Sequence, residues 1–179
     1  MAYPKITVNT GTTLQVVGSD SIPIPASDLP KLSGQITSAD TNKLIDTNTD
    51  FSNVSVGDIV YNTTDKSVAT VLAIDVGTNT LTLSASIFSG TLKNYTIFLG
   101  GPNGSSRIKS SEGCLLYVGS SEATMTAASS YVNVTVKTVS GSDVTFSNFP
   151  VGEYLPVQVI QLYTTGTSAA AENNCVAIW

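Results

Sequence analysis

The sequence predicts an all-β protein. Apolar and polar residues alternate with a period of two in short runs, which is typical of strands that bury one face. Gly, Asn, Asp and Ser gather between these runs, where they favour turns, and helical periodicity is nearly absent from the 179 residues. Ser and Thr make up about a quarter of the chain, and Thr favours the half-buried surface of a sheet.

The clearest alternating run covers residues 131–139. It places valines on one face of a strand and polar residues on the other. Residues 140–143, Ser-Gly-Ser-Asp, have turn chemistry. We therefore expect a hairpin with a second strand at 144–146.

A second β region precedes this hairpin. Residues 67–74 form a mostly apolar run, 75–79 carry turn residues, and 80–84 alternate again. Residues 95–99 and 59–62 are expected to add strands to the same sheet. The sequence thus predicts small antiparallel β-barrels or sandwiches.

Breaker residues suggest how the chain is divided. We expect an N-terminal strand and an extended Pro-rich arm over residues 1–35, followed by a β module over 36–99. The Gly- and Pro-rich stretch 100–106 reads as a linker. A C-terminal β module is then expected over 107–179.

Charge is sparse. Only 12% of the residues are charged, and 8 basic against 13 acidic side chains give a net charge of -5. An acidic chain opposes binding to nucleic acid, whose affinity comes largely from Lys and Arg at phosphates. The basic pair Arg107 and Lys109 is expected to lie in a solvated turn. A weakly charged surface costs less to bury against a partner, although composition bias of a β-rich chain explains it equally well.

Targeting and cysteine patterns exclude several classes. Residues 1–11 lack the apolar core of a secretory signal, and no stretch has the apolar length of a membrane span. We therefore expect synthesis in the cytoplasm and no membrane partner. Cys114 and Cys175 are too few for a disulfide scaffold or a zinc knuckle. Buried free thiols are expected, with a bridge between the two as the alternative.

Catalytic motifs are not found in the sequence. The chain has no histidine, which removes the usual general base and the commonest metal ligand. It also lacks a nucleophile elbow and a phosphate loop. We expect no catalytic, cofactor-binding or metal-binding residues and no small-molecule substrate. A change at a single carboxylate, such as Asp58 or Glu153, should alter stability only, and a carboxylate-based hydrolase is the residual alternative.

Residues 46–50 begin like a calcium loop, with oxygen side chains at Asp46, Asn48 and Asp50. An EF-hand needs Gly at its sixth position and Glu at its twelfth. Phe51 and Gly57 stand there instead. A hydrogen-bonded Asx turn is therefore the better interpretation.

Four tyrosines, at positions 95, 117, 131 and 154, fall in or beside expected strands. They are compatible with a sugar-binding face. Packing in a core or an interface is the default for such residues.

Four stretches resemble one group of proteins. Cys114–Gly119, Val144–Val159, Thr164–Ser168 and Val176–Trp179 are similar to the recurring pattern of small tailed-bacteriophage virion proteins known as head spike base proteins. The resemblance covers about the last 70 residues. Residues 46–88 separately resemble a β module of phage structural proteins.

The pattern departs from that group in two places, at 122–130 and at 170–174. The resemblance implies a virion structural protein, and within it a capsid decoration or cement protein that binds the major capsid protein lattice from outside. It also implies self-association, with a homotrimer favoured. A receptor- or glycan-binding module of a phage tail or a bacterial surface is the alternative.

Overall fold

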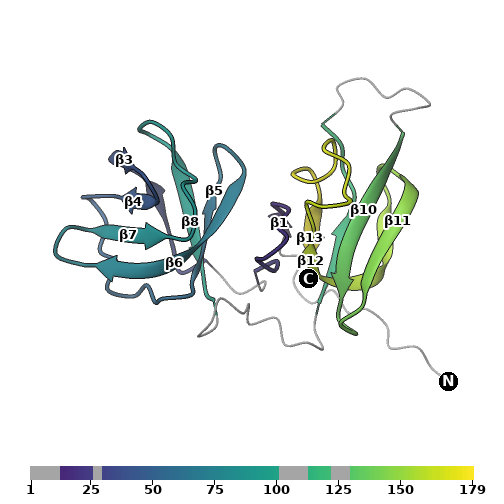
Figure 1. Ribbon diagram of the computed structural model, residues 1–179, viewed down its shortest axis with the longest axis horizontal. Helices are drawn as coiled ribbons and strands as arrows, with labels where there is room; N and C mark the ends of the chain where they lie inside the picture. The colour runs from purple at the N-terminus through teal and green to yellow at the C-terminus, as the bar shows by residue number, and fades with distance from the viewer. Residues whose placement is uncertain (1–12, 26–29, 101–112, 122–129) are drawn as a thin grey trace. The chain divides into compact units, whose positions relative to one another are not determined.

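The computed structural model of the chain describes residues 13–25, 30–100, 113–121 and 130–179. The predicted fold class is confirmed: these residues form strands in two antiparallel sheets, neither closed into a barrel, and contain no helix (Figure 1). The contacts divide the chain into two compact units. Unit 1 comprises Met1–Gly18 and Ser110–Trp179, and unit 2 comprises Ser19–Lys109.

Unit 2 holds a seven-stranded sheet with the order β2-β8-β5-β6-β7-β4-β3. Every neighbouring pair in it is antiparallel. Its strands are β2 (Leu32–Gln35), β3 (Ser38–Asp40), β4 (Lys43–Ile45), β5 (Ile59–Asn62), β6 (Ser67–Asp75), β7 (Thr80–Leu83) and β8 (Asn94–Phe98).

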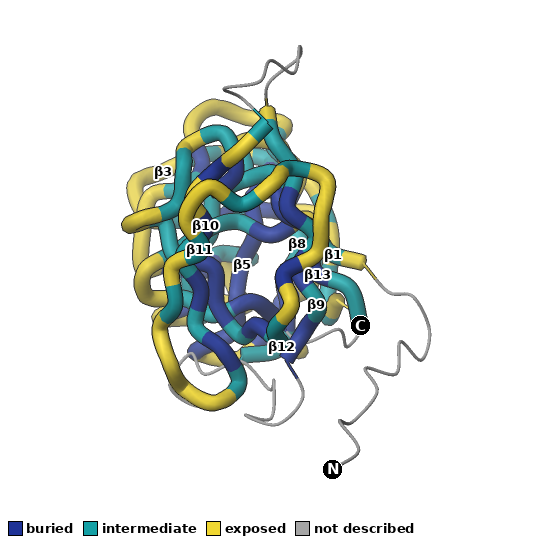
Figure 2. Tube along the Cα trace, turned by 90° about the vertical axis from the view of Figure 1, so that its right-hand side faces the viewer, coloured by how far each residue is buried: buried dark blue, intermediate teal, exposed yellow. Residues whose placement is uncertain are grey.

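The core of unit 2 lies against this sheet. Strand β5 is buried along its whole length, and it lies between β6 and β8 in the sheet. Buried residues lie along the strands and most turns are exposed, as the dark blue and yellow parts of Figure 2 show. Leu44, Leu81 and Leu83 come from the outer strands, and Phe51 packs beside the ring of Tyr95 at a centroid distance of 6.3 Å.

Unit 1 holds a six-stranded sheet with the order β1-β13-β9-β12-β10-β11. Its strands are β1 (Thr13–Gln15), β9 (Cys114–Tyr117), β10 (Tyr131–Thr138), β11 (Asp143–Pro150), β12 (Tyr154–Leu162) and β13 (Val176–Ile178). Strand β13 joins the two ends of the chain, since it pairs with β1 on one side and with β9 on the other.

Strand β12 changes partner along its length. Tyr154 lies opposite Tyr117 of β9, whereas Gln161 lies opposite Lys137 of β10. The register against β9 shifts between Tyr154 and Gln158, the interval that contains Pro156. A proline has no N–H for the ladder, and it is tolerated where the pairing is interrupted.

The predicted strands and hairpins are observed. The 131–139 run is β10, and its valines at 132, 134 and 136 are buried. The turn before β11 contains Gly141 with φ of 85°. The upstream strands at 59–62, 67–74, 80–84 and 95–99 correspond to β5, β6, β7 and β8.

The contacts draw the boundaries differently from the sequence prediction. Thr13–Gln15 belongs to the C-terminal sheet, and Leu32–Gln35 belongs to the sheet of the middle module, so the described residues of 1–35 do not form one separate part. Unit 2 is an insertion between β1 and β9. Three- and four-residue strands leave too little alternation to be recognised in a sequence.

The Pro-rich segment is partly packed rather than free. No described residue between Val16 and Lys31 lies in a strand, as the prolines predict. Ile24 and Pro25 are nevertheless buried. Residues 101–106 of the predicted linker and the basic pair at 107 and 109 lie outside the described residues. So do residues 123–129, the one stretch whose sequence allows a short helical turn.

Deleting residues 176–179 tests the role of β13. The deletion removes the strand that β1 and β9 share, so unit 1 should lose most of its stability while unit 2 stays folded. In two-dimensional NMR spectra we expect the amide signals of β9 to β12 to collapse toward random-coil positions. Deletion of Trp179 alone is the control, and dispersed unit 1 signals in the longer deletion would contradict the topology.

Candidate functional site

A hollow of about 430 Å³ opens on unit 2. It lies between the end of β2, the loop after β4, and the turn before β8. Its lining residues are Gly34, Gln35, Ile36, Thr37, Asp46, Asn48, Thr49 and Leu92. Five of these eight residues have hydroxyl, amide or carboxylate side chains, but apolar atoms contribute more of the exposed lining than polar atoms do.

Asp46 is the most buried polar group of the hollow, with 2% of its surface exposed. Its carboxylate accepts hydrogen bonds from Tyr95 Oη at 2.8 Å, Thr49 Oγ1 at 2.6 Å and the backbone N–H of Asn48 at 3.0 Å. The bond from Asn48 is that of an Asx turn. The predicted turn at residues 46–50 is therefore present, and its first carboxylate links the turn to β8.

Asp50 belongs to a second turn of the same loop. Its carboxylate accepts bonds from the N–H and the hydroxyl of Ser52, both at 2.8 Å. These bonds lower the pKa of Asp50, because they stabilise its charged form. Within the described part of the chain, no three His, Cys, Asp or Glu residues lie together as metal ligands would.

The Tyr95 ring lies beneath Gly34. A Cβ at position 34 would lie 2.6 Å from Tyr95 Oη and 2.9 Å from an Asp46 carboxylate oxygen, so only glycine fits there. Burial raises the pKa of the Tyr95 hydroxyl, and the Asp46 carboxylate adds to that rise. Because the tyrosine is 1% exposed, it presents no ring face on which a sugar in the hollow could stack.

Asp58 binds residues near both ends of unit 2. Its carboxylate is fully buried and accepts bonds from Lys31 Nζ at 2.7 Å, Ser55 N at 2.8 Å and Gly100 N at 2.9 Å. Lys31 directly precedes β2, and Gly100 follows β8. Asp58 therefore holds together the entry and the exit of the inserted unit, and its role is structural.

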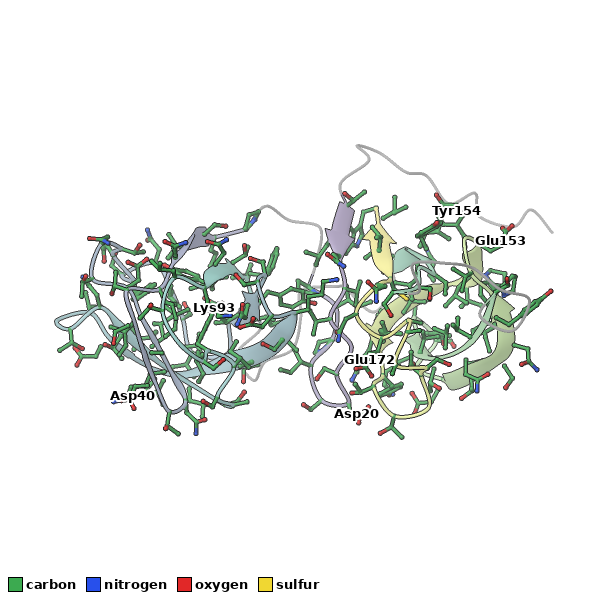
Figure 3. All side chains as sticks on the ribbon, turned by 90° about the horizontal axis from the view of Figure 1, so that it is seen from above. Asp20, Asp40, Lys93, Glu153, Tyr154 and Glu172 are labelled. Carbon is green, nitrogen blue, oxygen red and sulfur yellow. The ribbon has the colours of Figure 1, made fainter. Side chains whose placement is uncertain are left out.

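Other carboxylates are paired at the surface. Asp40 binds Lys43 at 2.9 Å, Asp65 binds Lys93 at 2.8 Å, and Asp143 accepts from Lys137 at 2.9 Å and from Tyr163 Oη at 2.8 Å. Hydrogen bonds from these lysines are the largest cause of the lowered pKa of each aspartate. Figure 3 shows Asp40 and Lys93 on unit 2, and Glu153, Tyr154 and Glu172 on unit 1.

The four tyrosines separate into core and surface. Tyr95 packs in the core of unit 2. Tyr131 is 54% and Tyr154 is 48% exposed, and Tyr154 packs edge-on against Tyr117 at 5.4 Å. An exposed, braced aromatic is common where a protein surface meets a partner.

Both cysteines are buried in unit 1, as predicted, and they are free thiols. Cys114 Sγ donates to the carbonyl of Val159, and Cys175 Sγ donates to that of Ala171, each at 3.3 Å. Burial raises the pKa of each thiol to about 12. A reactive cysteine needs the opposite shift, because the thiolate is the nucleophile.

Sequence reasoning missed two features of this region. The bond between Tyr95 and Asp46 joins residues far apart in the chain, and Gly34 is required by contacts that no local pattern reveals. The hydroxyl of a core tyrosine needs a hydrogen-bond partner. This requirement was the one signal in the sequence that pointed to a bond from Tyr95.

Comparisons with known proteins return no match: no protein-family model fits the chain, and neither a curated protein nor a solved structure matches it. No helix among the described residues is long and apolar enough to cross a membrane.

Replacing Gly34 tests the packing beneath the hollow. Gly34→Ala should lower the stability of unit 2 by about 1–3 kcal/mol, because the new methyl group must displace Tyr95 or Asp46. Gly77→Ala is the matched control, since the nearest atom to a Cβ there is 3.4 Å away and its φ suits any residue. Urea unfolding followed by circular dichroism measures both, and equal midpoints would refute the packing argument.

Replacing Asp58 tests the tie between the ends of unit 2. Asp58→Asn should cost about 3 kcal/mol, because it leaves the Lys31 ammonium unpaired and turns an amide toward backbone N–H donors. Asp40→Asn, at an ion pair whose side chains are 41% and 52% exposed, should change little. Thermal unfolding compares the two variants. A melting temperature of Asp58→Asn equal to that of the original protein would contradict the assignment.

Proposed function

We propose that this chain is a structural protein of a bacteriophage virion, a decoration or cement protein that stabilises the head by binding the major capsid protein lattice from outside. It acts through contact area and has no catalytic step. The resemblance of the C-terminal residues to head spike base proteins supports this proposal. The stretches that carry the resemblance include β9, much of β11 and β12, and β13, which are framework strands of unit 1.

The observation that carries the proposal is the way charges are paired. Four lysines, at positions 31, 43, 93 and 137, each contact an aspartate within 2.9 Å. Only 12% of the residues are charged, and Ser and Thr make up about a quarter of the chain. A surface with few free charges costs less to desolvate against a partner than a highly charged one, which suits contacts that are individually weak and repeated over a lattice.

The net charge of -5 favours an exterior position. Packaged DNA repels an acidic protein, whereas a protein on the outer face of the shell avoids that repulsion. We propose the major capsid protein and further copies of this chain as partners; the resemblance by itself implies a homotrimer. Nucleic acid, membrane and small-molecule substrates are not among them.

The second candidate is a receptor- or glycan-binding module of a phage tail or a bacterial surface. The hollow beside Asp46 favours it, because the hydroxyl and amide groups among its lining residues can bind sugars by hydrogen bonds. The covered Tyr95 ring argues against it. A glycan array with the purified protein separates the two candidates, since a selective signal is expected for the glycan-binding module alone.

The decoration role is tested on purified virions. Copy counting by mass spectrometry should find the protein in the head at many copies per particle. Particles that lack it should assemble but release their DNA at a lower temperature, because each lattice junction loses a few kcal/mol of binding energy. Location in the tail, or unchanged heat resistance, would refute the proposal.

Amine labelling of intact particles tests the exterior position. An impermeant reagent should modify Lys43, whose side chain is 41% exposed. Lys31 is the internal control, because its amine is held at 2.7 Å from the buried Asp58 carboxylate and should react slowly in free protein and particles alike. Complete protection of all lysines in intact particles would place the protein elsewhere.

A further inference from the structure

Among the residues that the structure describes, β11 is the longest edge strand. The two sheets have four edge strands, β1, β11, β2 and β3. Three of them have only three or four residues, whereas β11 has eight. Proteins keep exposed edges short or protect them, since an open edge offers unpaired N–H and C=O groups to another strand.

The edge is also poorly protected by charge. Asp143 is the only charged residue of β11, and Lys137 and Tyr163 already bind its carboxylate. A register shift lies opposite the interval from Val132 to Val134, Asn148 has φ of 52°, and Pro150 ends the strand. These features interrupt the far half and leave residues 143–146 as the regular part of the edge, with Asp143 as its one charged residue.

The apolar face of the sheet continues onto this edge without cover. Val134 and Val136 of β10 are fully buried, but Phe146 and Val144, which lie opposite them, are half-exposed. Phe146 is braced by Phe149 at a ring-centroid distance of 6.0 Å. A further strand beside β11 would bury Val144 and Phe146, as Val134 and Val136 of β10 are buried now.

The hydrogen bonds of the hairpin determine which groups of β11 point outward. Thr138 N donates to Ser142 O at 3.0 Å, and bonded and non-bonded positions alternate along an antiparallel pair. Val144 and Phe146 therefore bond to β10. The backbone groups of Asp143 and Thr145 therefore point away from β10.

We propose that β11 pairs antiparallel with β11 of a second copy of this chain, about a two-fold axis at Thr145. Thr145 then exchanges two backbone hydrogen bonds with its counterpart. Asp143 lies opposite Ser147 of the second copy, so no carboxylate faces another carboxylate. Val144 lies opposite Phe146 of the second copy on the apolar face.

This register is self-complementary around Thr145. The outward backbone groups meet each other, the apolar side chains meet on one face, and the two Thr145 hydroxyls meet on the other, where Thr–Thr pairs are favourable. A contact of this kind is isologous and gives a dimer. It is independent of the capsid proposal, and it differs from the trimer that the sequence resemblance implies.

Sedimentation equilibrium tests the contact. The original protein should approach twice 18.6 kDa as its concentration rises. Thr145→Lys places two ammonium groups opposite each other at the axis and should weaken dimerisation by at least about tenfold. Thr91→Lys, the same change at an exposed threonine of unit 2, should dimerise as the original protein does.

Amide hydrogen exchange of the original protein tests the contact without a variant. The amide of Thr145 should exchange fast in dilute protein and slow down as the concentration rises, whereas that of Phe146 should be protected throughout. Monomers at every concentration would overturn the proposal, as would a trimer that survives Thr145→Lys. Protection of Thr145 that does not depend on concentration would also overturn it, because another segment of the same chain would then cover the edge.

Discussion

The pairing of β1 with β13 is the constraint on which the arrangement of the chain depends. Thr13 lies opposite Ile178, so segments from the two ends of the described sequence form neighbouring strands. Strand β13 is then fixed against β9, and β9 against β12. Because β1 belongs to this sheet, the intervening residues 19–109 must leave unit 1 and return to it. Unit 2 is the result, a complete seven-stranded sheet inserted between two strands of another.

Two buried carboxylates make this insertion possible in different ways. Asp58 binds Lys31 and the N–H of Gly100, which brings together the two points where the chain enters and leaves unit 2. Asp46 ends β4 with an Asx turn and accepts the Tyr95 hydroxyl from β8. A buried charge costs free energy unless hydrogen bonds surround it. Each of these carboxylates has three such bonds, so each is a fixed point of the sheet rather than a reactive group.

The parts of the fold that the sequence predicted are those with enough length to show a period. Strand β10 alternates over eight residues, and β6 with β7 flank a turn of five recognisable residues. Strands β1, β3 and β4 have three residues each, and β2 contains Gly34, which suggests a turn. Their pairing depends on contacts with distant strands. The Asx turn at Asp46 was local and therefore predictable, but its bond to Tyr95 crosses the sheet and was not.

The insertion also determines how the chain would respond to a pull on its ends. Thr13 begins β1 and Ile178 ends β13, and the two residues lie side by side in antiparallel strands. A force between them would break the hydrogen bonds of the β1–β13 pair one after another, instead of loading all of these bonds at once. Tension could reach residues 19–109 only after β1 had separated from β13. The short pair of β1 and β13 would thus break first, at low force. Until it broke, the seven-stranded sheet of unit 2 would carry no load.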